Sequence, residues 1–210
     1  MIILAGMIGV GKTTYTDRLA KSLGTQAFFE PVANNPILDS YYKDPDKYAF
    51  VLQIFFLNQR FKSIKAAYKS QNNILDRSIY EDALFTYINT LEGSISQEEY
   101  AIYLDLLDNM MEELEGLPQK APDLLIYLDG DFDHILENIK KRGRDFEQID
   151  GKPELLNYYK LLYSHYGKWY EDYRHSPKMR IDTTQFDIAN DADWDKVYSV
   201  IQNEMKKLGL

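Results

Sequence analysis

Residues 6–13 read Gly-Met-Ile-Gly-Val-Gly-Lys-Thr, and no other stretch limits the fold of this chain as strongly. The octet fits G-x-x-x-x-G-K-[ST], the P-loop pattern, in which backbone N–H groups surround a phosphate. An apolar run at residues 1–5 precedes it and suits a buried parallel strand, while residues 14–23 follow as an amphipathic helix. Strand, glycine-rich turn and helix are the context that a P-loop requires, which argues against a chance match.

The P-loop pattern gives roles to its own residues. Its glycines let the backbone curl, so that successive N–H groups can point at an anion. Lys12 can reach the outer phosphates of a nucleotide, and the Thr13 hydroxyl can hold Mg²⁺. We therefore expect ATP and Mg²⁺ as cofactors. The residues predicted to bind the nucleotide here are Gly6, Met7, Ile8, Gly9, Val10, Gly11, Lys12, Thr13 and Thr14.

Length and composition narrow the class of protein. A chain of 210 residues suits one α/β domain, and we expect a single domain over residues 1–210. The absence of cysteine excludes disulfides and thiolate sites, and makes the reducing cytoplasm the simplest location. A formal net charge of −9 disfavours nucleic acid as a partner, because a polyanion repels an acidic chain. No segment reaches the length of a membrane span, so we expect no membrane partner.

Short apolar runs alternate with helical patterns along the chain. The expected strands are residues 1–5, 26–29, 74–76, 124–129 and 179–182. The expected helices are 14–23, 47–69, 79–91, 96–114, 132–141, 153–173 and 193–207, with a loop or short helix at 34–42. This alternation predicts an α/β fold, a parallel sheet with helices on both faces.

Charged side chains close three of the expected strands: Glu30, Asp76 with Arg77, and Asp129. The carboxyl ends of parallel strands share one edge, where open α/β sheets bind ligands. A carboxylate and an arginine beside a γ-phosphate suggest phosphoryl transfer to a hydroxyl, with Arg77 and Lys12 stabilising the developing charge. The alternatives are a solvated turn at Glu30 and an ordinary strand-terminal ion pair at Asp76 and Arg77.

A second basic cluster, Arg142-Gly143-Arg144, follows an expected helix. Two arginines one residue apart can close over phosphates as a lid, at about residues 142–152. A lid would exclude water, which a kinase needs in order to avoid hydrolysing ATP. The alternative is an exposed basic helix end that complements the helix dipole.

Taken together, these motifs resemble those of the deoxynucleoside kinases in order and spacing. The residues that carry the resemblance are 6–13, Glu30-Pro31-Val32, Asp76-Arg77-Ser78 and Arg142-Gly143-Arg144. The match spans nearly the whole chain and is closest in character to the bacterial deoxyadenosine/deoxyguanosine kinases. The resemblance implies a P-loop kinase fold with a five-stranded parallel sheet and a homodimer packed through helices. It also implies ATP-dependent 5′-phosphorylation of a deoxynucleoside, most often a purine.

The resemblance also implies roles for the catalytic residues. Glu30 resembles the carboxylate beside the sugar 5′-hydroxyl, the expected base, and Arg77 the residue that holds that hydroxyl and Glu30. Asp76 stands at the position of an acidic residue near Mg²⁺. The choice between Glu30 and Asp76 as proton acceptor stays open.

The remaining substrate residues also come from the resemblance. Tyr42 and Glu147 match the pair that binds the 3′-hydroxyl, and Tyr42 also crowds the 2′ position, so ribose should fit poorly. Gln53 matches the amide that reads the base edge, but its two orientations suit different bases. Arg60 and Asp82 match polar residues deeper in the base pocket, or form a structural ion pair.

Other positions carry weaker expectations. Where the family often has an aromatic residue stacking on the base, this chain has Thr86, with Phe85 beside it. Residues 185–187 lie where the family packs the adenine of ATP. A tyrosine and leucine stripe is expected to serve core or dimer packing: Tyr158, Leu162, Tyr166 and Tyr170.

Competing functions remain at this level. One is a deoxynucleoside kinase that prefers deoxycytidine or has broad specificity. Another is a nucleoside monophosphate kinase, against which Glu30 argues because a carboxylate repels an acceptor phosphate. A third is a nucleotide-dependent switch, in which the γ-phosphate controls mobile loops.

Overall fold

A five-stranded, all-parallel sheet forms the centre of the computed structural model, which describes residues 1–30, 35–69, 72–113 and 122–210. The strands are β1 (Ile2–Ala5), β2 (Ala27–Phe28), β3 (Ile74–Asp76), β4 (Leu124–Asp129) and β5 (Lys178–Asp182). Their order across the sheet is β2-β3-β1-β4-β5, with Ile2 of β1 opposite Ile74 and Leu124. The predicted fold class is therefore confirmed.

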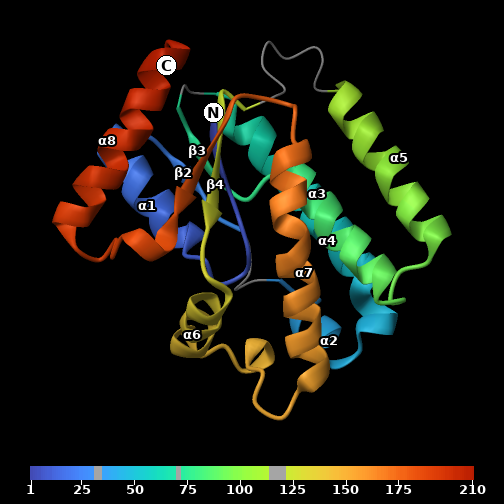
Figure 1. Cartoon of the computed structure of the whole chain (residues 1–210). Helices are drawn as coiled ribbons and strands as arrows, with labels where there is room; N and C mark the ends of the chain where they lie inside the picture. Colours follow the sequence, from blue (N-terminus) through green and yellow to red (C-terminus); the bar gives the residue numbers. More distant parts are fainter. Residues whose placement is uncertain (31–34, 70–71, 114–121) are drawn as a thin grey trace.

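Helices cover both faces of this sheet (Figure 1). In that view α1 and α8 lie on one side of the strands, and α3, α4, α5 and α7 lie on the other. The helices are α1 (Lys12–Leu23), α2 (Leu38–Lys43), α3 (Pro45–Ala67), α4 (Ile79–Leu91), α5 (Gln97–Glu113), α6 (Phe132–Arg142), α7 (Pro153–Asp172) and α8 (Asp191–Leu208). Short 3-10 turns follow at Asp145–Glu147 and Thr183–Gln185.

Local sequence signals explain where the helices begin. The Asp44 side chain accepts from the backbone N–H of Lys47 at the start of α3, and Pro45 occupies the first turn, where its missing N–H costs nothing. Before α5, Ser96 and Glu99 form a capping box, with hydrogen bonds of 2.8 and 3.1 Å. These caps orient α3 and α5 against the sheet.

The alternation of side chains along β1 separates two hydrophobic cores. Ile2 and Leu4 pack into the core that includes α1 and α8, whereas Ile3 packs into the core beneath α3 and α5. Successive residues of a strand point to opposite faces, so a short apolar run fills both layers. Packing on both faces holds the sheet between its helices. Polar side chains are found instead at the carboxyl ends of its strands.

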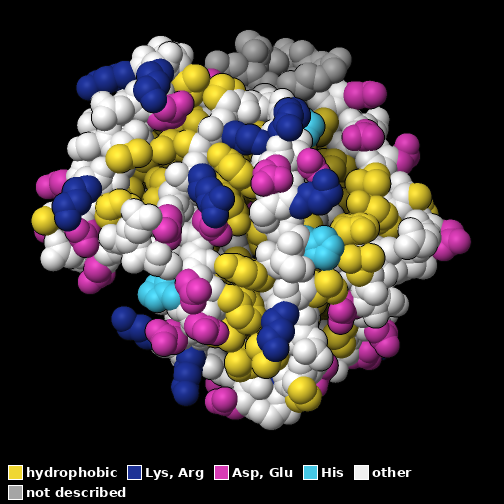
Figure 2. Space-filling model, in the orientation of Figure 1, with side chains coloured by type: hydrophobic (Ala, Val, Ile, Leu, Met, Phe, Trp, Pro, Cys, Tyr) yellow, Lys and Arg dark blue, Asp and Glu magenta, His cyan; other side chains and the backbone are white. Residues whose placement is uncertain are grey.

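The surface is of mixed charge, and Figure 2 shows acidic side chains interspersed with basic ones on this face. Within the described ranges, no helix combines the length and apolarity needed to cross a bilayer. Two residues of the expected Glu30-Pro31-Val32 motif, Pro31 and Val32, lie outside the described part of the chain.

Candidate active site

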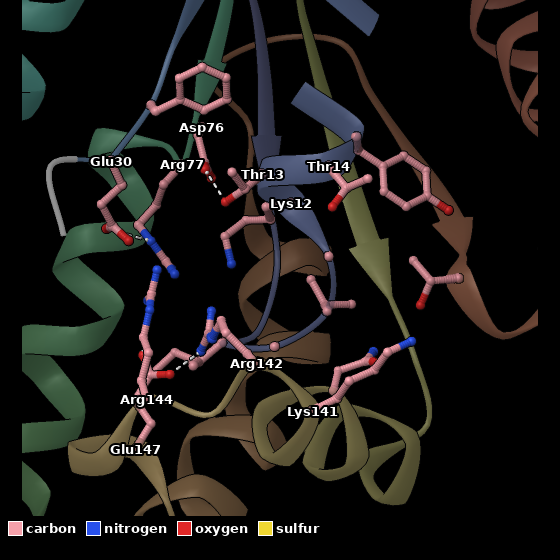
Figure 3. Close-up of a pocket in the computed structure, with 18 of the residues that line it drawn as sticks. Lys12, Thr13, Thr14, Glu30, Asp76, Arg77, Lys141, Arg142, Arg144 and Glu147 are labelled. Atoms are coloured by element: carbon pink, nitrogen blue, oxygen red, sulfur yellow. Dashed lines mark hydrogen bonds and ion pairs between the residues drawn. The ribbon is translucent and has the colours of Figure 1, made fainter. Parts of the chain in front are cut away.

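A cavity of about 930 Å³ opens at the carboxyl edge of the sheet. The P-loop forms its floor, and the ends of β2 and β3, the helices α3 and α6 and the loop after β5 supply its walls. Figure 3 shows side chains from these segments pointing into the same space. The fold therefore brings residues far apart in sequence to one site, as the strand-end pattern predicts.

The P-loop backbone depends on glycine at two crowded positions. Gly6 has φ of 146°, and a Cβ there would lie 2.4 Å from the Leu128 carbonyl oxygen. Gly9 has φ of 86°, and its Cβ would lie 2.6 Å from the Ile139 side chain. Among the residues predicted to bind nucleotide, 8–14 line the cavity, and Gly6 and Met7 do not.

Lys12 begins α1 and is buried, with its ammonium group turned onto the loop that precedes it. Its Nζ donates to the carbonyl oxygens of Gly6, at 2.6 Å, and Met7, at 3.0 Å. Burial, helped by the nearby charge of Arg77, lowers the pKa of Lys12 to about 8. A triphosphate bound in the cavity would place a negatively charged partner beside this ammonium group.

Thr13 and Asp76 meet at the mouth of the P-loop. The Thr13 hydroxyl donates to Oδ2 of Asp76 at 2.8 Å (Figure 3). Oδ1 of Asp76 is buried without a hydrogen-bond partner among the described residues, and burial raises the pKa of this carboxyl group. A hydroxyl beside an unsatisfied carboxylate oxygen is a donor set that fits Mg²⁺, which takes oxygen ligands and keeps several waters.

Glu30 and Arg77 form an ion pair at the ends of β2 and β3, with 2.9 Å between Oε1 and Nε. Burial opposes ionisation of Glu30, but Arg77 and Arg60 outweigh it and lower the pKa of this carboxyl group. The Arg77 guanidinium also lies 4.5 Å from the centre of the Phe85 ring. A carboxylate kept ionised beside a guanidinium can orient a hydroxyl and accept its proton.

Arg60 joins the two carboxylates that flank it. Its Nε donates to Asp82 at 3.1 Å and its Nη2 lies 3.2 Å from Glu30, while Nη1 donates to the Asp76 carbonyl oxygen. Asp82 lines the cavity, and Arg60 does not. Burial raises the pKa of Asp82 to about 6 in spite of Arg60. The structural ion pair is thus present, and Asp82 still faces the site.

The wall beyond Glu30 is aromatic and amide-bearing. Tyr42 and Gln53 both line the cavity, and Gln53 is buried on α3. The Tyr42 ring stacks on Phe146, with 5.1 Å between the ring centres. Thr86, by contrast, turns its hydroxyl to the Asp82 carbonyl oxygen, and Phe85 lines the cavity in its place.

The two arginines of the expected lid are both paired with Glu147. Arg142 contacts Oε2 of Glu147, and Nη1 of Arg144 lies 3.2 Å from Oε1. In Figure 3 the two arginine side chains point up toward Lys12 and Arg77. All three residues line the cavity, and so does Tyr42, the residue expected to share the sugar site with Glu147.

The loop after β5 closes the far end of the cavity. Phe186 and Asp187 line it, whereas the Gln185 amide donates to Asp182 at 2.8 Å. Asp129, the third charged strand end, pairs with Arg180 and is not among the lining residues. The adenine-binding role expected for residues 185–187 therefore concerns Phe186 and Asp187.

Two residues of the site escaped the sequence analysis. Glu81 is fully buried and contacts Arg77, and the Tyr166 hydroxyl lies 2.6 Å from its carboxylate. The pattern Ser78-x-x-Glu81 is a capping box and could have located Glu81 at the start of α4. The sequence pattern predicts core packing for Tyr166. Its ring does lie in the core, but its hydroxyl contacts Glu81.

Comparisons with known proteins bear on the whole chain. A family model described as deoxynucleoside kinase matches residues 2–207. A deoxyguanosine kinase of Lactobacillus johnsonii is 48% identical over 210 residues, covering 100% of this chain and 94% of that protein. A deoxyadenosine kinase of Lactobacillus acidophilus is 45% identical over 210 residues, covering 100% of this chain and 98% of that protein.

A solved structure gives the same result for the fold. The deoxyadenosine kinase from M. mycoides with bound dATP superposes with a TM-score of 0.79 and 31% identity, covering 98% of each chain. The chain is a kinase and belongs to the deoxynucleoside kinase family.

Proposed function

We propose that this chain transfers the γ-phosphoryl group of ATP to the 5′-hydroxyl of a deoxynucleoside, with purine deoxynucleosides as its main substrates. The observation that carries the proposal is the Glu30–Arg77 ion pair, 2.9 Å long, which lines the same cavity as the P-loop. This arrangement provides a phosphate site and a hydroxyl site on opposite sides of one space. Similar chains named deoxyguanosine and deoxyadenosine kinases support the purine preference.

The chemistry follows from the charges around the cavity. The 5′-oxygen attacks the γ-phosphorus in line, the bond to the β-phosphate oxygen breaks, and ADP leaves. Glu30, held ionised by Arg77 and Arg60, takes the hydroxyl proton. Lys12 and Arg77 offset the negative charge that develops on the transferring group. Asp76 remains the alternative acceptor, although Thr13 already donates to it.

Mg²⁺ belongs to the same proposal. Thr13 and Asp76 are the residues proposed to hold it, supported by their 2.8 Å contact and by the unpartnered Oδ1 of Asp76 among the described residues. When bound, the ion would neutralise part of the charge on the phosphate groups. We propose that residues 142–152 act as the lid over these phosphates, supported by the cavity-lining positions of Arg142 and Arg144.

Substrate selection is proposed to depend on Tyr42, Gln53, Asp82 and Glu147. The Asp82 carboxylate accepts hydrogen bonds from base amino groups, which adenine, guanine and cytosine carry and thymine lacks. Tyr42 and Glu147 are proposed to hold the 3′-hydroxyl, and Tyr42 to exclude a 2′-hydroxyl. Their shared position on the cavity wall supports this assignment.

A panel assay tests the function directly. ADP formation is followed with each of the four deoxynucleosides, with adenosine and with deoxyadenosine monophosphate, using Lys12→Met protein purified in parallel to reveal contaminating kinases. The expected result is ADP formation that depends on deoxyadenosine or deoxyguanosine and falls with adenosine. Preferential use of the monophosphate would identify a monophosphate kinase, acceptor-independent hydrolysis a switch, and preference for deoxycytidine would refute the purine assignment.

We also propose that the chain is a cytoplasmic homodimer. Two exposed apolar side chains on α4, Tyr87 and Leu91, offer surface for helix packing between copies. The absence of cysteine supports the reducing compartment. Sedimentation of the purified chain at assay concentrations measures the oligomeric state, and a monomer would contradict the dimer.

A further inference from the structure

One carboxylate oxygen of Glu81, Oε1, accepts hydrogen bonds from three separate parts of the chain. Glu81 lies in the first turn of α4 and is 0% exposed. Its Oε1 lies 2.9 Å from the Gly6 backbone nitrogen, 2.9 Å from Nη1 of Arg77 and 2.6 Å from the Tyr166 hydroxyl. The capping box involves the other oxygen, Oε2, at 3.3 Å from the Ser78 nitrogen. Helix capping therefore accounts for only one of the two carboxylate oxygens.

The three donors belong to segments with separate tasks in the proposed reaction. Gly6 is the first residue of the P-loop, which receives the phosphate donor. Arg77 pairs with Glu30, where the acceptor hydroxyl is proposed to lie. Tyr166 comes from the middle of α7, and its hydroxyl also lies 3.0 Å from the Gly6 carbonyl oxygen and 3.2 Å from Nη1 of Arg77. Glu81 thus accepts from the Gly6 N–H, while the Gly6 carbonyl oxygen accepts from Lys12 and lies beside the Tyr166 hydroxyl.

We infer that Glu81 is a positioning residue that, together with Tyr166, holds Arg77 and the start of the P-loop at one fixed separation. The inference rests on the proposed function, in which Arg77 serves the acceptor and the P-loop serves the donor. In-line transfer requires the attacking oxygen and the γ-phosphorus at a near-attack distance. Fixing the two sides to the same carboxylate oxygen sets that distance before either substrate binds.

The backbone of Arg77 gives independent support. Arg77 has φ of 85°, in the left-handed region that residues with a Cβ adopt at a cost. Its N–H donates to the Leu4 carbonyl oxygen at 2.8 Å, and its guanidinium is held by Glu81 at 2.9 Å. Such a conformation persists where the surroundings determine it from several directions. Glu81 supplies one of these restraints, and it is buried where water cannot replace it.

Glu81→Gln tests the inference, because it keeps the shape of the side chain and removes its charge. We expect kcat for the preferred deoxynucleoside to fall by roughly tenfold to a hundredfold, the effect of a small misplacement of reacting groups, with KM for that substrate changed by less than about threefold. The control is Glu99→Gln, the same substitution in the capping box of α5, where Glu99 accepts from Ser96 at 2.8 Å. The control should retain wild-type turnover.

The split between turnover and folding separates positioning from stability. A residue that only caps α4 would lower the thermal midpoint of Glu81→Gln and leave kcat of the folded protein at the wild-type value. Wild-type kcat in folded Glu81→Gln would overturn the inference.

Tyr166→Phe covers the case in which Glu81→Gln fails to fold. It removes the hydroxyl that contacts Glu81, Arg77 and Gly6 and keeps the packing of the ring. We expect a fall in kcat of about threefold or more, with the thermal midpoint close to wild type. Unchanged kcat in this variant would refute the inference. Loss of deoxynucleoside-dependent activity in the wild type would instead refute the proposed function.

Discussion

Glu30 lies between two guanidinium groups, Arg77 at 2.9 Å and Arg60 at 3.2 Å. These contacts overcome the cost of burying its charge and lower its pKa, so the carboxylate is ionised at neutral pH. An ionised carboxylate is ready to accept a proton, but its low basicity makes orientation of the hydroxyl as important as proton transfer. The contribution of Glu30 should therefore appear in turnover more than in binding.

Glu30→Gln measures this contribution at the scale of one residue. We expect kcat to fall by roughly two orders of magnitude, as for a lost general base, while KM for the deoxynucleoside changes little. Steady-state kinetics of purified protein give both values, and Glu98→Gln on the exposed surface of α5 serves as the matched control. Near-normal turnover in Glu30→Gln would contradict Glu30 as the base and would favour Asp76 as the proton acceptor.

Sequence patterns could locate Glu30 and Arg77, but not every partner that holds them. Both follow short strands whose carboxyl ends lie at the same edge of the parallel sheet as the P-loop, and that edge brings such positions together. Glu81 differs, because the contacts of its Oε1 come from residues 6, 77 and 166. These segments are distant in sequence, so only the folded chain reveals that a capping residue also contacts the P-loop.

At the scale of elements, the segment that runs from α6 into the 3-10 turn Asp145–Glu147 links the two substrate sites. Arg142 ends α6, Arg144 precedes the 3-10 turn, and Glu147 closes the turn and accepts from both arginines. If the sugar 3′-hydroxyl binds Glu147, it competes with the arginines for the same oxygens. Released arginines could then turn to the phosphates, which couples acceptor binding to lid closure.

Arg144→Ala tests the lid. Loss of this guanidinium should slow the chemical step by at least about tenfold, because a charge that stabilises the transferring phosphoryl group is removed. Single-turnover measurements isolate that step from product release. Lys140→Ala, an exposed position in the last turn of the preceding helix α6, is the control and should react at the wild-type rate. An unchanged single-turnover rate in Arg144→Ala would show that Arg144 does not stabilise the transferring phosphoryl group.

Local sequence signals predict where several helices begin, but they do not predict how the strands are ordered in the sheet. Asp44 with Pro45 and Ser96 with Glu99 mark helix starts that the structure contains. The position of β2 at the sheet edge and of β1 at its centre depends on which faces pack together, and no local pattern encodes that order. The parallel sheet was predictable from the alternation of elements, and the order of its strands was not.

At the scale of the whole molecule, the site concentrates buried charge in a chain whose surface is of mixed sign. Lys12, Arg60 and Arg77 are each less than one tenth exposed. The negative charges that act on them come from four carboxylates, Glu30, Asp76, Glu81 and Asp82. Burying such groups is unfavourable unless they are paired, and among the described residues the hydrogen-bond partners of Lys12 are two carbonyl oxygens. The free enzyme therefore keeps a destabilising charge that its proposed substrate ATP would neutralise.

Lys12→Met tests this balance between stability and function. The pKa of Lys12 falls from 10.5 to about 8 on folding, so its charged form is disfavoured in the folded state. The cost is fully present below pH 8, shrinks as pH rises toward 10.5, and amounts to about 3 kcal/mol at most by linkage. At pH 7 the variant should therefore unfold a few degrees higher than the wild type without ligand, and ATP should no longer raise its midpoint.

Thermal unfolding with and without ATP makes the comparison, and Lys21→Met provides the control on the same helix. Lys21 is exposed and pairs with Asp17, so its loss should change neither the ligand-free midpoint nor the shift caused by ATP. The same scans at pH 9.5 add a check of sign, because Lys12 is then largely neutral in the folded wild type and the advantage of Lys12→Met should shrink. A lower ligand-free midpoint in Lys12→Met, with the ATP shift intact, would mean that the ammonium stabilises the empty P-loop through its two carbonyl contacts and does not bind the triphosphate.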